Sequence, residues 1–365
     1  MKNKILEVTF GGLGHGGVSS VIFSIVSELK DKYDFGCVVY RTKLERESDF
    51  AKIGKLHRLP CYRKNGKKSL FEEMTRPIRF FFGIYNLCKK EKYTVVHAHN
   101  EPDEGVVLLA AKFAGVKIRI AHSHNTPSPK KPSLFKRILN SINRSLINRN
   151  ATHKIGCSKN ACESFFKTNT FKVIVNPVDL DKFVFKTKEA KKDDYSFVHI
   201  GRYCYQKNQT FLIDVFSIIK KTFIHSSLNL IGFGEDEQLL KDKINTLGLN
   251  DCVHLLPGKE IPINEYLANA DFMIFPSIYE GFGIVLIEAQ ASGVFCFCSE
   301  NIQDEADAGM IKKIDLASGA GCWAECIIQY ISQNAGKEYF IGEKLKLYEK
   351  TRIISQYELL YEGKQ

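Results

Sequence analysis

The chain has 365 residues, 44% of them hydrophobic, which is enough to bury two cores of ordinary domain size. Its eleven cysteines include no CxxC pair, and no long apolar run predicts a signal peptide or a membrane-spanning helix, so we expect reduced thiols and a cytoplasmic protein. The first 178 residues carry 32 Lys and Arg against 14 Asp and Glu, and the remainder carries 20 against 27, so the first half predicts an anionic partner. A membrane surface is favoured over a nucleic acid, because no zinc-finger spacing or aromatic nucleic-acid signature accompanies the charge.

An apolar run, KILEVTF, predicts a first strand, and a glycine-rich loop and an apolar helical pattern follow it. This order opens a Rossmann-like domain. Gly12, Gly14 and Gly17 also satisfy G-x-G-x-x-G, which makes a dinucleotide-dependent oxidoreductase an alternative. That alternative requires an acidic residue at the end of the second strand, but Tyr40 and Arg41 stand there.

Residues 41–92 are irregular and basic, with 15 Lys and Arg against 6 Asp and Glu. Arg76 and Arg79 lie beside three consecutive aromatic residues, Phe80 to Phe82. Two interpretations stay open. The cations and rings bind a lipid headgroup boundary, or the rings form the core face of a helix.

Two predicted strands each end in a histidine pair, His97 with His99 and His122 with His124. Alternate residues of a strand share a face, so each pair could chelate a metal ion. No neighbouring set of cysteines or carboxylates completes a zinc-like site, and we predict no metal.

Residues 127–150 combine cationic side chains with apolar residues at helical spacing, which predicts an amphipathic helix. A charged face over an ordinary core stripe is the alternative. The cations are Lys130, Lys131, Lys136, Arg137, Arg144 and Arg149, and the apolar positions are Leu134, Ile138, Leu139, Ile142 and Leu146.

A second α/β pattern starts at Tyr195, where a strand leads into a loop that contains Gly201, Arg202 and Lys207. A guanidinium and an ammonium group in such a loop can neutralise a diphosphate. Further strands follow, each leading to a turn, and the tail from Gly336 to Gln365 is predicted to be helical.

The most informative stretch is FPSIYEGFGIVLIEAQASGVFCFCS, residues 275–299. It predicts a strand, a tight glycine turn and a helix over 284–291. The glycines leave backbone N–H groups open at the helix start, so this turn is a candidate phosphate site. Glu288 lies inside an apolar helix, where a buried carboxylate needs hydrogen-bond donors such as ribose hydroxyls.

Glu280 and Glu288, with G-F-G after the first and A-x-A-x-G after the second, resemble the E-x7-E signature of retaining glycosyltransferases of family 4. The whole stretch most resembles their bacterial capsular and exopolysaccharide branch. The resemblance implies a GT-B fold, that is, two Rossmann-like α/β domains facing across a cleft. It implies an acceptor-side domain over 1–178, a nucleotide-sugar domain over 179–340, and a helix within 341–365 that returns to the first domain.

The resemblance also implies roles for individual residues. Arg202 and Lys207 bind the donor diphosphate, Glu280 the sugar hydroxyls and Glu288 the ribose. His124 lies near the reacting centre, with His122 as the alternative. Other residues expected at the phosphates and sugar are Gly16, Gly17, Gly201, Gly281, Phe282, Gly283 and Ile284.

The function implied is transfer of a sugar, with retention, from a nucleotide-diphosphate sugar to a lipid-linked saccharide. We expect a UDP-sugar donor, no metal or other cofactor, and a peripheral position on the inner face of the cell membrane. A dinucleotide-dependent oxidoreductase and a non-catalytic binder of anionic surfaces remain the alternatives.

Overall fold

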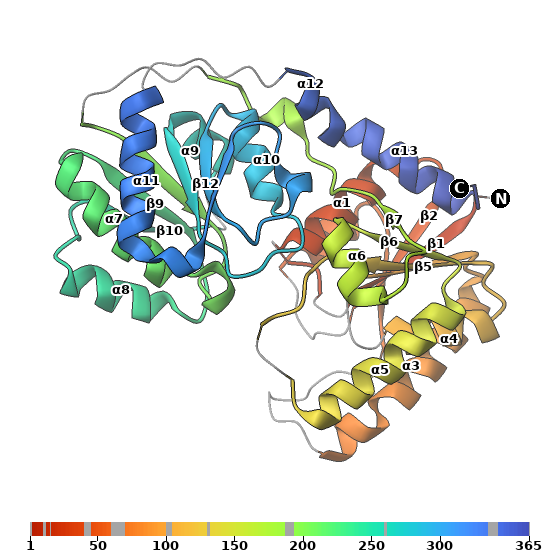
Figure 1. Ribbon diagram of the computed structural model, residues 1–365. Helices are drawn as coiled ribbons and strands as arrows, with labels where there is room; N and C mark the ends of the chain where they lie inside the picture. Colours follow the sequence, from red (N-terminus) through yellow and green to blue (C-terminus); the bar gives the residue numbers. More distant parts are fainter. Residues whose placement is uncertain are drawn as a thin grey trace. The chain divides into compact units, whose positions relative to one another are not determined.

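The structure is a computed structural model that describes residues 2–9, 12–14, 16–39, 45–59, 70–99, 104–129, 132–186, 193–258, 261–334 and 342–364 (Figure 1). The chain divides into two compact units. One consists of Met1–Pro177 together with Lys350–Gln365, and the other of Val178–Glu349.

The described residues of the first unit form a seven-stranded parallel sheet in the order β3-β2-β1-β4-β5-β6-β7. The first strand lies inside the sheet, as in a doubly wound Rossmann-like domain. The strands are β1 (Lys4–Thr9), β2 (Asp34–Val39), β3 (Lys55–Arg58), β4 (Val95–His99), β5 (Ile118–Ser123), β6 (His153–Gly156) and β7 (Lys172–Val173).

Helices cover both faces of this sheet, and α4 packs against both α3 and α5 (Figure 1). Ser133 caps α5 and Ser158 caps α6, because each hydroxyl accepts a hydrogen bond from a backbone N–H in the first turn. The helices are α1 (Gly17–Leu29), α2 (Glu47–Phe50), α3 (Leu70–Glu91), α4 (Glu104–Phe113), α5 (Leu134–Asn150), α6 (Lys159–Phe166) and α13 (Lys350–Tyr361).

The two faces of the first sheet differ in chemistry. One face is apolar: Leu6, Val96 and Ala121 belong to a core that also contains side chains of α3, α4 and α5. The alternate positions are polar. Glu7 pairs with His97 in register, and His99 pairs with His122, so these side chains share the opposite face.

The C-terminal helix α13 packs on the first unit. Ile353, Tyr357 and Tyr361 are buried. Lys32 Nζ lies 2.7 Å from the Glu358 carboxylate, and α13 also contacts α1. Helix α13 therefore packs on the same unit as β1 and α1, although these elements lie at opposite ends of the sequence.

The second unit contains a six-stranded parallel sheet in the order β10-β9-β8-β11-β12-β13, again doubly wound. The strands are β8 (Ser196–Ile200), β9 (Ser227–Gly232), β10 (Val253–Pro257), β11 (Phe272–Phe275), β12 (Phe295–Ser299) and β13 (Ile311–Ile314). The helices are α7 (Gln209–Thr222), α8 (Glu237–Thr246), α9 (Ile263–Asn269), α10 (Ile284–Ala291), α11 (Gly319–Asn334) and α12 (Gly342–Leu345), with short 3-10 turns at η1 (Leu180–Lys182), η2 (Tyr205–Lys207), η3 (Asp304–Ala306), η4 (Leu316–Ser318) and η5 (Lys346–Tyr348).

The three consecutive phenylalanines of α3, Phe80 to Phe82, differ in burial, so they lie neither all in the core nor all at the surface. Phe80 is buried in the core, Phe81 is partly buried against it, and Phe82 is 57% exposed. Neither interpretation holds for all three rings, because successive residues of a helix face directions about 100° apart.

Helix α5 contradicts the interpretation of its first half as a core stripe. Leu134, Ile138, Leu139 and Ile142 are between 47% and 70% exposed. We call these four residues the α5 apolar face. Lys136 and Arg137 are exposed beside it, whereas Lys130 and Lys131 lie outside the described residues.

The cysteines of the described residues are free, and most are buried. None of the described helices combines the length and hydropathy needed to cross a membrane.

Candidate active site

Two loops of the second unit meet at the carboxyl edge of its sheet, one after β8 and one between β11 and α10. Gln206 Nε2 donates to the carbonyl of Tyr279 at 2.9 Å, and the N–H of Ile278 donates to the carbonyl of Gln206 at 2.8 Å. Doubly wound folds bind ligands at this edge of the sheet.

The same contact brings two predicted site residues together. Lys207 Nζ lies 2.6 Å from Glu280 Oε1, and their side chains are only 16% and 8% exposed. Lys207 also lies over the ring of Phe275, 4.5 Å from its centroid. Gly201 makes room for this side chain, since a Cβ there would lie 3.2 Å from Lys207 Cε. A largely buried, paired ammonium group is thus held at the loop junction.

Arg202 lies on the same loop but has a different partner. Its guanidinium donates to Glu235 at 2.7 Å, and the two side chains are 65% and 57% exposed. An exposed ion pair of this kind contributes little to stability and can open to receive another anion.

The turn before α10 has the geometry expected for an anion site. Gly283 caps the helix with φ at +87°, a conformation that favours glycine. Phe282 in this turn is buried, and its ring centroid lies 6.1 Å from that of Tyr348. This packing helps to hold the turn in place. The first backbone N–H groups of α10, beginning with Ile284, follow directly, and the helix has no acidic residue in its first turn to occupy them.

Glu288 is half-buried on the second turn of α10. Burial raises the pKa of its carboxyl group to about 7, and Lys182 opposes this only in part. Near neutral pH the carboxyl group is therefore only partly ionised, and hydrogen-bond donors from a bound ligand would favour its ionised form.

A second set of predicted residues meets in the first unit. His99 Nε2 lies 2.6 Å from Glu7 Oε2, and His99 Nδ1 lies 2.8 Å from His124 Nε2. His97 Nε2 lies 3.1 Å from His122 Nδ1. These side chains, at the carboxyl ends of β1, β4 and β5, are all at most 6% exposed.

Helix α13 completes this cluster, which we call the histidine cluster. The Tyr361 hydroxyl donates to Glu7 Oε1 at 2.9 Å and lies 2.9 Å from His97 Nδ1. Burial alone would raise the pKa of Glu7, but His97 and His99 hold it below its ordinary value. Burial lowers the pKa of His99 to about 4, and lowers those of His122 and His124 well below the ordinary histidine value.

Ring nitrogens of His97, His99 and His122 lie within 4.8 Å of one another, close enough to surround a metal ion. The hydrogen bonds above already connect these nitrogens to one another, to Glu7 and to Tyr361. Glu7 and Tyr361 were not identified from the sequence as members of this cluster. The single carboxylate in the apolar run KILEVTF could have indicated that Glu7 is a buried polar residue.

The glycine loop after β1 leads into α1. Gly16 caps this helix, and a Cβ there would meet no atom of the described residues within 4 Å. Ser19 braces the loop by donating to the carbonyl of Gly12 at 3.0 Å. A phosphate contact at Gly16 and Gly17 stays a prediction.

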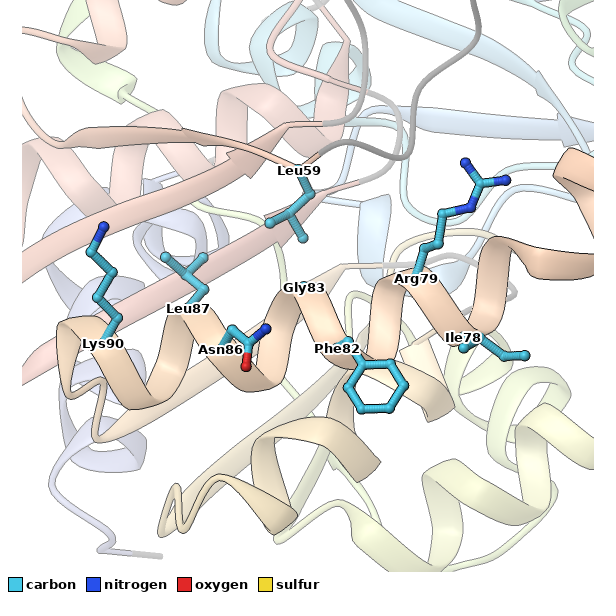
Figure 2. A pocket seen from close by; sticks show the side chains of 8 residues that line it. All are labelled: Leu59, Ile78, Arg79, Phe82, Gly83, Asn86, Leu87 and Lys90. Carbon is cyan, nitrogen blue, oxygen red and sulfur yellow. The ribbon is translucent and has the colours of Figure 1, made fainter.

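Two surface hollows lined by described residues lie beside helices of the first unit. One, of about 720 Å³, begins at Asn125 directly after His124 and is lined by Leu134, Ile138, Arg137 and Arg144 among others. The other, of about 490 Å³, lies along α3, and Figure 2 shows Arg79 and Lys90 toward its opposite ends. Both combine apolar side chains with cations.

Two protein-family models match the chain, one for each unit. The model for "Glycosyltransferase Family 4" matches residues 15–182, and that for "Glycosyl transferases group 1" matches residues 181–306. The chain belongs to the glycosyltransferases whose two domains are described by the family 4 and group 1 models. This assignment replaces the oxidoreductase alternative, because both parallel-sheet units match glycosyltransferase domains, the first from residue 15 and so from within the G-x-G-x-x-G loop.

The glycosyltransferase resembles several characterised or named proteins. It is 28% identical to the putative glycosyltransferase EpsF of Bacillus subtilis, over 94% of this chain and 92% of that protein. It is 27% identical to the UDP-Gal:α-D-GlcNAc-diphosphoundecaprenol α-1,3-galactosyltransferase of Escherichia coli, over 67% and 69%. HepE of Anabaena, solved with UDP and glucose, superimposes with a TM-score of 0.76 at 17% identity, over 99% of this chain and all of that one. The last likeness supports the GT-B fold.

Proposed function

We propose that this glycosyltransferase transfers a sugar, with retention, from a UDP-sugar to a lipid-linked saccharide in capsular or exopolysaccharide synthesis. The second unit binds the donor. Lys207 and Arg202 neutralise the diphosphate, Glu280 binds sugar hydroxyls and Glu288 binds the ribose. His124 of the first unit contacts the transferred sugar.

The Lys207–Glu280 contact carries this proposal. An ammonium group held by a carboxylate, on the loop that leads to a helix start without a side-chain cap, is an arrangement that can stabilise charge on a departing diphosphate. UDP is bound in HepE, and the E. coli relative is named for a UDP-sugar donor, which supports the choice of nucleotide.

Binding of UDP should strengthen as the pH rises from 6 to 8, because an ionised Glu288 offers both carboxylate oxygens as hydrogen-bond acceptors to the ribose hydroxyls. In the free protein its pKa is about 7, so a protonated carboxyl competes with binding below that pH. We expect a loss of up to about tenfold in affinity between pH 8 and pH 6, with proton release on binding near neutral pH. Calorimetry in buffers of different ionisation enthalpy measures both quantities.

UDP itself gains a proton near pH 6, so the Glu288→Gln variant is the reference. It should bind more weakly at pH 8 and show only the ligand's own pH dependence. Glu280→Gln should keep the wild-type binding profile and lose transfer. Identical pH profiles in wild type and Glu288→Gln would remove Glu288 from the ribose site.

The acceptor side of the proposal depends on the first unit. The hollow after His124 is lined by apolar and cationic residues, which suits a lipid diphosphate carrier. The α5 apolar face, with Lys136 and Arg137, adds a surface that an anionic membrane would cover. The E. coli relative is named for a diphosphoundecaprenol acceptor, which supports this assignment.

The protein should co-sediment with phosphatidylglycerol vesicles at low salt and be released as salt rises. Each basic residue near an anionic surface contributes about 1 kcal/mol, so replacing Lys136 and Arg137 by serine should weaken binding about 30-fold. Replacing the exposed Lys221 and Lys241 of the second unit is the matched control and should change little. Equal binding by both double variants would assign the basic surface to a different anion.

A further inference from the structure

A hydrogen-bonded chain of three buried side chains leads from β1 to His124. Glu7 Oε2 lies 2.6 Å from His99 Nε2, and His99 Nδ1 lies 2.8 Å from His124 Nε2. Glu7 and His99 are at most 1% exposed and His124 is 6% exposed. Because water hardly reaches these groups, the positions of the protons in the two hydrogen bonds are determined by the three side chains.

The direction of each hydrogen bond follows from Glu7. An ionised carboxylate can only accept, so His99 must donate through Nε2–H. Burial lowers the pKa of His99 to about 4, so at neutral pH the ring has one N–H and its Nδ1 accepts. His124 must then donate through its own Nε2–H. In a neutral ring this makes Nδ1 the accepting nitrogen of His124.

We propose that Glu7 and His99 are positioning residues that fix His124 in its Nε2–H tautomer, so that Nδ1 accepts a hydrogen bond from a hydroxyl group of the substrate sugar. The sugar contact rests on the function proposed above, whereas the tautomer follows from the cluster alone. A carboxylate that orients an imidazole in this way is a recurrent device in enzymes.

Tyr361 makes the effect of a conservative substitution at Glu7 predictable. Its hydroxyl donates to Glu7 Oε1 at 2.9 Å, so His99 donates to Oε2, which also lies 3.3 Å from His97 Nδ1. In Glu7→Gln the amide oxygen should take the Tyr361 proton and the amide NH₂ should face His99. His99 would then accept at Nε2 and donate through Nδ1–H, and His124 would in turn accept at Nε2 and carry its proton on Nδ1.

The first measurement is the tautomeric state of the histidines in the full chain labelled with ¹⁵N in the imidazole rings. Two-bond ¹H–¹⁵N correlations distinguish protonated from bare ring nitrogens, and His99→Gln and His124→Gln variants assign the signals. Wild type should show protonated Nε2 and bare Nδ1 in both His99 and His124. Both patterns should reverse in Glu7→Gln, and neither should change in His254→Gln, an exposed histidine of the second unit.

The second measurement separates positioning from structure. Glu7→Gln should bind UDP as wild type does, because the donor site lies in the other unit, while transfer at saturating donor falls at least about a hundredfold. If UDP binding and transfer are absent in wild type, the proposed function fails and the tautomer result still stands. Reversed tautomers with unchanged transfer would overturn the positioning role.

The wild-type spectrum decides the tautomer even if Glu7→Gln does not fold. A proton on Nδ1 of either His99 or His124 in wild type, or unchanged tautomers in a folded Glu7→Gln, would overturn the proposal. So would a stoichiometric metal ion in the purified protein that is lost on replacing His97, His99 or His122, since those nitrogens would then hold a metal instead of protons.

Discussion

Replacing Lys207 with alanine should lower the rate of sugar transfer by at least about a hundredfold, because a positioned charge at a developing anion typically contributes about 3 kcal/mol to catalysis. The ammonium group lies 2.6 Å from Glu280 Oε1 and is largely shielded from water, so solvent cannot replace it. Release of nucleotide diphosphate at saturating donor and acceptor measures the effect.

Glu280, the ion-pair partner of Lys207, and Arg202, on the same loop, provide controls for this experiment. Glu280→Gln also breaks the ion pair but keeps the ammonium group, so comparison with Lys207→Ala separates the two halves of the pair. Arg202→Ala should lower transfer without lowering the unfolding temperature, because its pair with Glu235 is exposed. Glu235→Ala frees Arg202 and should leave transfer near normal. Near-normal transfer in both Lys207→Ala and Arg202→Ala would remove the proposed diphosphate contacts.

Local patterns predicted the turn and helix over residues 281–291 of the second unit well. The helix predicted over residues 284–291 is α10, Ile284–Ala291, with the bounds expected. Here the signals are strong and local: a strand, a turn that only glycine fits at Gly283, and an apolar helical run. The sequence also indicated Lys207 and Glu280, although not that they form an ion pair across 73 positions of the chain.

The first unit was harder to predict, because its polar site is assembled from both ends of the chain. Glu7 and Tyr361 are 354 positions apart, and no periodicity relates them. The histidine pairs were visible as HxH patterns, but their neighbours were not, so each pair suggested chelation instead of a hydrogen-bonded network. The register of β1, β4 and β5 supplies the missing relation.

Removing the Tyr361 hydroxyl should destabilise the first unit by about 1–3 kcal/mol, because Glu7 loses a donor in a site that water does not reach. In Tyr361→Phe the ring still packs against Tyr33 and Phe35, so little apolar area is lost. Hydrogen exchange followed by mass spectrometry should show about 5- to 150-fold faster exchange in β1, β4 and α13.

Tyr357→Phe is the matched control, one helical turn away on the same face of α13. Its hydroxyl is buried, and among the residues that the structure describes no hydrogen-bond partner reaches it. Deleting an unsatisfied polar group should leave stability unchanged or increase it. A loss of stability in Tyr361→Phe without a loss in Tyr357→Phe would show that the hydrogen bond from Tyr361 to Glu7 stabilises the first unit. Equal losses in both variants would show that the hydrogen bond of Tyr361 has no stabilising effect of its own.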